Sequence, residues 1–171
     1  MKNTLFFTFL FALNIPVLMG FDIYVKTVGF SSPYYQFYLD EDGTQLFDIT
    51  SGGSDNLVLG NTYTFTRIDS GHAFYLSDQN AWRSDLSADS SIALSGDGSR
   101  TSGINSGESF TLTISNDFDP SAESLYYYCT AHASMVNGFS SVVVPEPSTY
   151  ALIFGALAAL LVYCKRRNSS R

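Results

Sequence analysis

Short apolar and aromatic runs, separated by turn residues, recur between residues 34 and 144 of the chain. In two of them, residues 62–66 and 110–114, apolar and polar side chains alternate residue by residue, which is the pattern of a half-buried strand. No long window before residue 145 has helical periodicity. The pattern therefore predicts an all-β domain. Its expected strands are residues 34–39, 56–59, 62–68, 73–76, 110–114, 125–129 and 139–144.

The segment at residues 84–107 differs from the rest because it is rich in Ser, Gly and Asp and has few large apolar side chains. It is predicted to be a long surface excursion with one short strand at residues 92–94. A plain solvated loop and a binding loop are both open for it. Seven to eight short strands at this spacing favour a Greek-key sandwich or barrel.

The N-terminus has the pattern of an export signal. Lys2 precedes an apolar run at residues 5–13, and a small residue follows at Gly20. Residues 1–20 are therefore predicted to be a secretory signal peptide that is cleaved near Gly20. A retained membrane anchor is the alternative, although the run is shorter than the ~20 residues that a membrane span needs.

Residues 145–171 carry a second targeting pattern. Two closely spaced prolines stop the preceding strand and favour an extended linker. The apolar stretch at residues 150–164 would form a helix ~22 Å long, and cations follow it as they do at a cytoplasmic anchor. An ordinary tail anchor with a proline-containing stalk is one interpretation. The residues that define the pattern are Pro145, Glu146, Pro147, Arg166 and Arg167.

The remaining residues, 21–144, are enough for one domain with a core of its own. This part contains fifteen acidic and four basic side chains, a formal net charge of −11 against −7 for the whole chain. A nucleic-acid partner is disfavoured by such a charge, and so are other anionic polymers. Basic proteins and metal cations are compatible with it.

The segment from residue 127 to residue 135 carries the candidate chemistry. Cys129 ends a predicted strand, His132 follows three residues later and Met135 three residues after that, while His72 lies upstream. Two imidazoles, one thiolate and a weak thioether are the ligand set of a mononuclear blue-copper site. These four are the only His, Cys and Met residues between positions 21 and 144. Ligation would also explain an unpaired thiol in an exported domain.

The run Tyr127-Tyr128-Cys129-Thr130-Ala131-His132-Ala133-Ser134-Met135, with the apolar strand after it, resembles the ligand loop and last strand of the cupredoxin family. The spacing of Cys129, His132 and Met135 is similar to the short loop of amicyanin-type members. The resemblance implies a Greek-key sandwich that binds one type 1 copper ion. It implies His72, Cys129, His132 and Met135 as ligands. The segment between His72 and Cys129 is longer than the corresponding segment of small electron carriers in this family.

The C-terminal pattern resembles the PEP-CTERM sorting signal of Gram-negative bacteria. That resemblance implies recognition by an exosortase and a precursor held in the inner membrane, at least transiently, by a C-terminal transmembrane helix. It also implies cleavage near the Pro-Glu-Pro motif and delivery to the cell surface or the extracellular matrix.

The leading hypothesis is an exported, surface-sorted copper protein that transfers electrons or holds copper. A redox partner protein and an extracellular polysaccharide matrix are its candidate partners. An enzyme is not expected, because both histidines belong to the metal set and the chain has no G-x-S-x-G elbow. The alternative is a metal-free structural or adhesive matrix protein on a cupredoxin-like fold.

Overall fold

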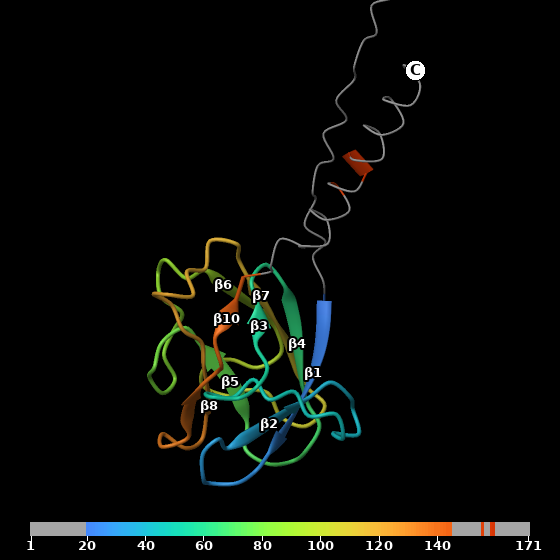
Figure 1. Ribbon diagram of the computed structural model, residues 1–171. Coiled ribbons are helices and arrows are strands. Elements are labelled where there is room, and N and C mark those ends of the chain that lie inside the picture. Colours follow the sequence, from blue (N-terminus) through green and yellow to red (C-terminus); the bar gives the residue numbers. More distant parts are fainter. Residues whose placement is uncertain (1–19, 145–154, 156–157, 160–171) are drawn as a thin grey trace, which may run out of the picture.

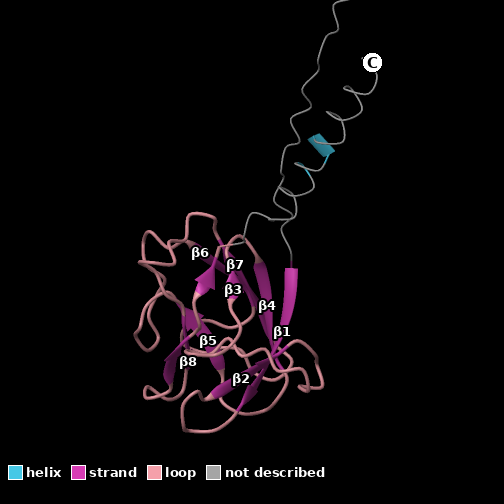
Figure 2. Cartoon of the chain, viewed as in Figure 1, coloured by secondary structure: helices cyan, strands magenta, loops and turns pink. Residues whose placement is uncertain are grey.

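The computed structural model describes residues 20–144, 155, 158 and 159, and confirms the predicted all-β class (Figure 1). Strands and connecting loops make up residues 20–144 (Figure 2). Within the described residues, none of the helical structure is long and apolar enough to cross a membrane. The strands are β1 Gly20–Thr27, β2 Tyr35–Tyr38, β3 Leu57–Val58, β4 Thr62–Arg67, β5 Phe74–Ser77, β6 Ile92–Gly96, β7 Ser109–Ile114, β8 Tyr126–Cys129, β9 Val136–Gly138 and β10 Val142–Val143.

The strands form three sheets. The largest has the order β2-β1-β4-β7-β6, the second has the order β5-β8-β9, and β10 pairs with β3 in the third. The β1–β4 and β10–β3 pairs are parallel, and the others are antiparallel. A parallel pair cannot be closed by a hairpin, so β2 and β3 lie in the connection between β1 and β4.

All three sheets contribute side chains to one apolar core. The alternation predicted for residues 62–66 and 110–114 is present, with Phe65 and Phe110 pointing inward from β4 and β7. Aromatic rings fill much of the interior: Phe74 stacks on Phe110 at a centroid distance of 5.8 Å and contacts Phe65 at 5.7 Å. Rings at such separations add to the stabilisation that their buried area supplies.

The strand predictions were largely confirmed, with three differences. β1 and β9 were missed, although Ile23 and Val25 alternate with exposed or half-buried neighbours in β1. The last predicted strand, 139–144, is regular only at Val142–Val143, since Phe139 instead makes an isolated bridge to Thr50. The predicted strand at 92–94 is β6.

The segment at 84–107 is only partly a surface excursion, which corrects that prediction. β6 pairs with β7 at the edge of the largest sheet, and Ile92 is buried there. Ile104 is fully buried and exchanges backbone hydrogen bonds of 2.8 and 3.0 Å with Phe74. Leu86 and Leu94 of the same segment also pack against the core, so a few apolar residues attach this polar segment to it.

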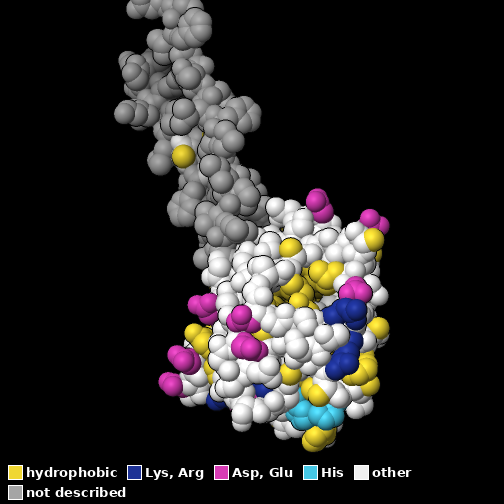
Figure 3. Space-filling model, turned by 180° about the vertical axis from the view of Figure 1, so that it is seen from behind, with side chains coloured by type: hydrophobic (Ala, Val, Ile, Leu, Met, Phe, Trp, Pro, Cys, Tyr) yellow, Lys and Arg dark blue, Asp and Glu magenta, His cyan; other side chains and the backbone are white. Residues whose placement is uncertain are grey.

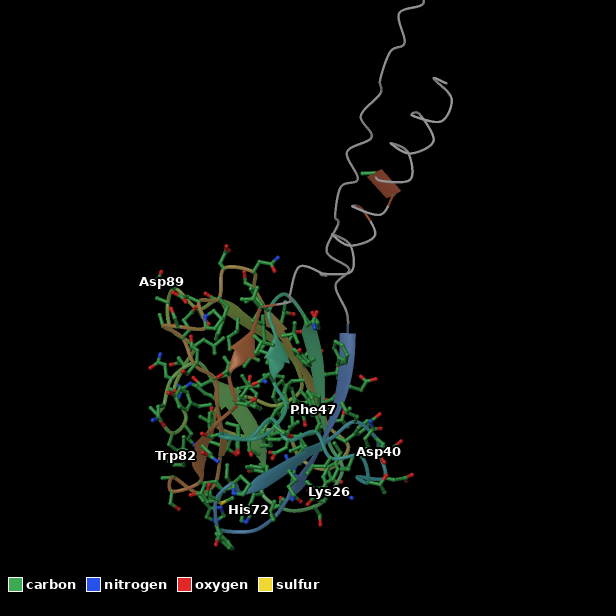
Figure 4. The ribbon with its side chains drawn as sticks, in the orientation of Figure 1. Lys26, Asp40, Phe47, His72, Trp82 and Asp89 are labelled. Carbon is green, nitrogen blue, oxygen red and sulfur yellow. The ribbon has the colours of Figure 1, made fainter. Side chains whose placement is uncertain are left out.

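The two ends of residues 20–144 lie at the same end of the domain, where β1 begins and β10 ends (Figure 1). His72 lies at the opposite end (Figure 4). The predicted leader, apart from Gly20, and the predicted sorting signal at 145–171, apart from residues 155, 158 and 159, lie outside the described residues.

Candidate metal centre

Three of the four predicted ligands converge at the end of the domain opposite the start of β1. One ligand atom from each of His72, Cys129 and His132 lies within 4.8 Å of the other two. The Sγ atom of Cys129 is 3.3 Å from Nδ1 of His132, and the two imidazole rings lie edge to face with centroids 4.7 Å apart.

Strand pairing brings the upstream histidine to the other two residues. β5 pairs with β8 so that Phe74 lies opposite Cys129. His72 lies two residues before Phe74, and its neighbour Ala73 accepts a backbone hydrogen bond of 3.2 Å from Thr130. A separation of more than fifty residues in the sequence therefore becomes a contact between adjacent chain segments.

The loop from Cys129 to Met135 is a tight turn closed by its own backbone. The His132 amide donates to the Cys129 carbonyl at 3.4 Å, the Met135 amide to the His132 carbonyl at 3.0 Å, and the Cys129 amide to the Met135 carbonyl at 3.0 Å. Met135 is fully buried among the core side chains. Its place as a weak fourth ligand stays a prediction.

The donor set and its burial suit a soft or borderline metal ion. Cys129 is fully buried, whereas both histidines are partly exposed, so that the thiol lies at the bottom of the cluster. Imidazole nitrogens and thiolate sulfurs bind such ions at about 2.0–2.3 Å, and two atoms on one ion are then at most about 4.6 Å apart. The observed separations need little adjustment to meet this limit.

Electrostatics around His72 favour its neutral, ligating form. Burial lowers the pKa of His72, and the positive charges of His132 and Arg67 lower it further, while Asp69 opposes them. A neutral imidazole is the form that binds a metal ion.

Two aromatic residues, Phe30 and Trp82, lie at the edge of the site. The sequence patterns did not assign either of them to it. Phe30 is 71% exposed, and its ring lies edge to face with His72 and His132 at centroid distances of 4.6 and 5.2 Å. The indole N–H of Trp82 donates to the Cys129 carbonyl at 2.9 Å. Figure 3 shows the histidines at the surface beside apolar side chains, with cations on the same face. The sequence signal that could have pointed to Trp82 is that it is the one tryptophan of the chain.

The loop after Trp82 also holds the end of the ligand strand. Arg83 donates from Nε to the Thr130 carbonyl at 2.8 Å, and its guanidinium carbon lies 4.3 Å from the centre of the Trp82 ring. Arg83 has a left-handed backbone, with φ of 54°, which is uncommon for a residue other than glycine. Side chains of one loop thus donate hydrogen bonds to the carbonyls of both Cys129 and Thr130.

Tyr35, which reaches the site from β2, was also missed. Its hydroxyl donates to the Ala73 carbonyl at 3.0 Å, with the His72 carbonyl 3.4 Å away. Burial raises the pKa of Tyr35, and the negative charge of a Cys129 thiolate acts in the same direction. A neutral phenol therefore fixes the segment that carries His72. A single buried tyrosine in a predicted strand gives no sign of this role.

The residues of the predicted sorting motif, Pro145, Glu146, Pro147, Arg166 and Arg167, lie outside the described residues. No protein-family model, curated protein or solved structure matches the chain. The geometry around His72, Cys129 and His132, together with the sequence patterns, is therefore the evidence for function.

Proposed function

We propose that the chain is an exported, surface-sorted, copper-binding protein with a cupredoxin-like Greek-key sandwich, which transfers electrons or holds copper. The observation that carries the proposal is the convergence of His72, Cys129 and His132 within 4.8 Å. Several sheets around one core, with the cluster at one end of the domain, are consistent with such a fold.

Each residue of the cluster has a distinct part in this proposal. Cys129 supplies a thiolate from the buried end of β8, and the two histidines supply neutral imidazoles from the exposed side. The hydrogen bonds of the Cys129–Met135 turn hold two donors at fixed spacing, and Tyr35 holds the third. A copper ion bound by this set would accept and return one electron.

A copper titration tests the proposal. Cu(II) added to the full-length chain, purified in a mild detergent, should produce strong visible absorption from thiolate-to-copper charge transfer at one ion per chain. C129S should abolish the band. C164S is the matched control, because it removes the other thiol of the chain and should leave the band unchanged. A colourless wild-type chain that binds no copper would refute the proposal.

A metal-free structural or adhesive protein is the second candidate function, and one contact favours it. Cys129 Sγ and His132 Nδ1 are 3.3 Å apart, a distance at which thiol and imidazole can satisfy each other without an ion. In that case C129S should lower stability, and Cu(II) should not raise the unfolding temperature of the wild type. Copper-dependent stabilisation that C129S abolishes would exclude this candidate.

Surface sorting is a proposal that rests on the sequence alone. Pro145, Glu146 and Pro147 would be recognised by an exosortase after the following apolar stretch has entered the inner membrane. Cell fractionation tests it: the triple alanine variant of the motif should stay in the membrane fraction at full length, while the wild type reaches the surface. Equal distributions would refute exosortase-type sorting.

A further inference from the structure

Arg67, the last residue of β4, is a buried cation beside the candidate metal centre. Its side chain is fully inaccessible to solvent, and its Nη2 atom lies 2.6 Å from Oδ1 of Asp69. Nη1 donates to the Val25 carbonyl at 3.2 Å. Nε has no hydrogen-bond partner within the described part of the chain. A buried charge is costly, so such a residue needs partners and commonly has a role.

The hydroxyl of Thr27 connects this arginine to His72. Thr27 Oγ1 accepts from Nη2 of Arg67 at 2.8 Å and from the backbone N–H of His72 at 3.0 Å. The Thr27 amide donates to Oδ2 of Asp69 at 2.8 Å. Arg67, Asp69 and Thr27 therefore form one network that ends on the backbone of a predicted ligand.

The charges of this network do not cancel at the cluster. The Asp69 side chain is 31% exposed, whereas that of Arg67 is fully buried, so water screens the carboxylate more than the guanidinium. Arg67 also lies close to the cluster through Tyr35, because its guanidinium carbon is 5.5 Å from the centre of the Tyr35 ring, whose hydroxyl donates to the Ala73 carbonyl next to His72. A residual positive potential favours the less positive of two metal oxidation states.

We propose that Arg67 is a positioning residue of the metal centre, which fixes His72 through Thr27 and biases a bound copper ion towards Cu(I). The inference rests on the proposed function. The hydroxyl of Thr27 positions His72, and the charges of Arg67 and Asp69 set the preference between Cu(I) and Cu(II).

Variants of the full-length chain separate the two effects when the reduction potential is measured by redox titration of the visible band. R67M should lower the preference for Cu(I) about tenfold, a shift of about 59 mV for a one-electron couple. D69N should shift the potential upward. T27V keeps both charges and should leave it near the wild-type value. K26M, which removes a half-buried cation from the same strand as Thr27, is the control and should also leave it unchanged.

Amide hydrogen exchange of the metal-free chain measures the positioning directly. The His72 amide should lose about tenfold in protection in T27V and R67M, the equivalent of one hydrogen bond. It should keep its protection in K26M. R67K retains the charge without the planar fork, so it should lower protection at His72 while leaving the potential near wild type. If R67M does not fold, D69N alone tests the charge effect through its upward shift, and R67K tests the positioning.

Specific outcomes overturn each part of the inference. Equal potential shifts in R67M and K26M, or an unchanged potential in both R67M and D69N, would overturn the charge effect. Unchanged His72 protection in T27V would overturn the positioning. A wild-type chain without copper would refute the proposed function together with the charge effect. The exchange data on the metal-free chain would then still decide the positioning.

Discussion

Replacement of Gly71 by alanine tests the packing that places His72. A Cβ atom at this position would lie 2.2 Å from Oγ1 and 2.6 Å from Cβ of Thr27, and 3.3 Å from Nη2 of Arg67. Rotation of the Thr27 side chain can move the hydroxyl but not Cβ, which is fixed to the backbone of β1. The loop that carries His72 must therefore move away from β1.

The expected cost follows from the hydrogen bonds that this movement breaks. The His72 amide would lose its bond to Thr27, and the approach of Arg67 to the same hydroxyl would be disturbed. Two net hydrogen bonds of about 1 kcal/mol each, with a further penalty for a buried polar group left unsatisfied, give about 2–4 kcal/mol. Gly71 does not have a left-handed backbone, so steric contact alone should produce this loss.

Denaturant unfolding of the full-length chain, followed by the fluorescence of Trp82, measures the effect. G71A should lower the midpoint with little change in slope. G138A is the matched control, since its added Cβ would meet nothing closer than 3.8 Å and should change stability by less than about 1 kcal/mol. The same stability in G71A and G138A would show that Gly71 does not pack on Thr27 in this way.

Three further outcomes follow from the structure. F65A should lose about 3–5 kcal/mol in thermal unfolding, because Phe65 is fully buried among aromatic rings, and a loss below about 1.5 kcal/mol would contradict the described core. W82F should lose about 1 kcal/mol, measured in the same way, because the Cys129 carbonyl loses its indole donor. A hydrogen bond from the Thr44 hydroxyl, assisted by the Gln45 amide, lowers the pKa of Asp40 below the ordinary 3.8. The stabilisation by Asp40 is therefore present above the unfolded-state pKa and is lost as pH falls through the lower folded-state value. The midpoint of wild type should exceed that of D40N at neutral pH and approach it in acid, and a constant difference across this range would contradict the assignment.

The fold class and the types of candidate ligand followed from local sequence patterns. Alternation in residues 62–66 and 110–114 predicts half-buried strands, because side chains on a strand point to opposite faces in turn. The same rule could have found β1, where Ile23 and Val25 are buried. The segment belongs to the predicted domain at 21–144, but its strand was not among those predicted.

The partners of each strand depend on packing between distant segments, which a local pattern does not encode. Phe30 and Trp82 lie in loops, and only the folded chain brings them to the rings of the histidines and to the Cys129 carbonyl. Thr27 and Arg67 look like ordinary strand residues in the sequence. Their role arises because β1 and β4 pair in parallel, which places both residues at the same end of the sheet.

Local sequence patterns alone predicted an all-β domain and one candidate set of soft metal ligands, since residue types and short spacings are properties of the chain alone. Tertiary structure decided that His72 meets Cys129 and His132, through the register of β5 on β8. It also decided that a buried arginine lies beside them. Register is set by which side chains fill the common core, and that selection involves the whole domain at once.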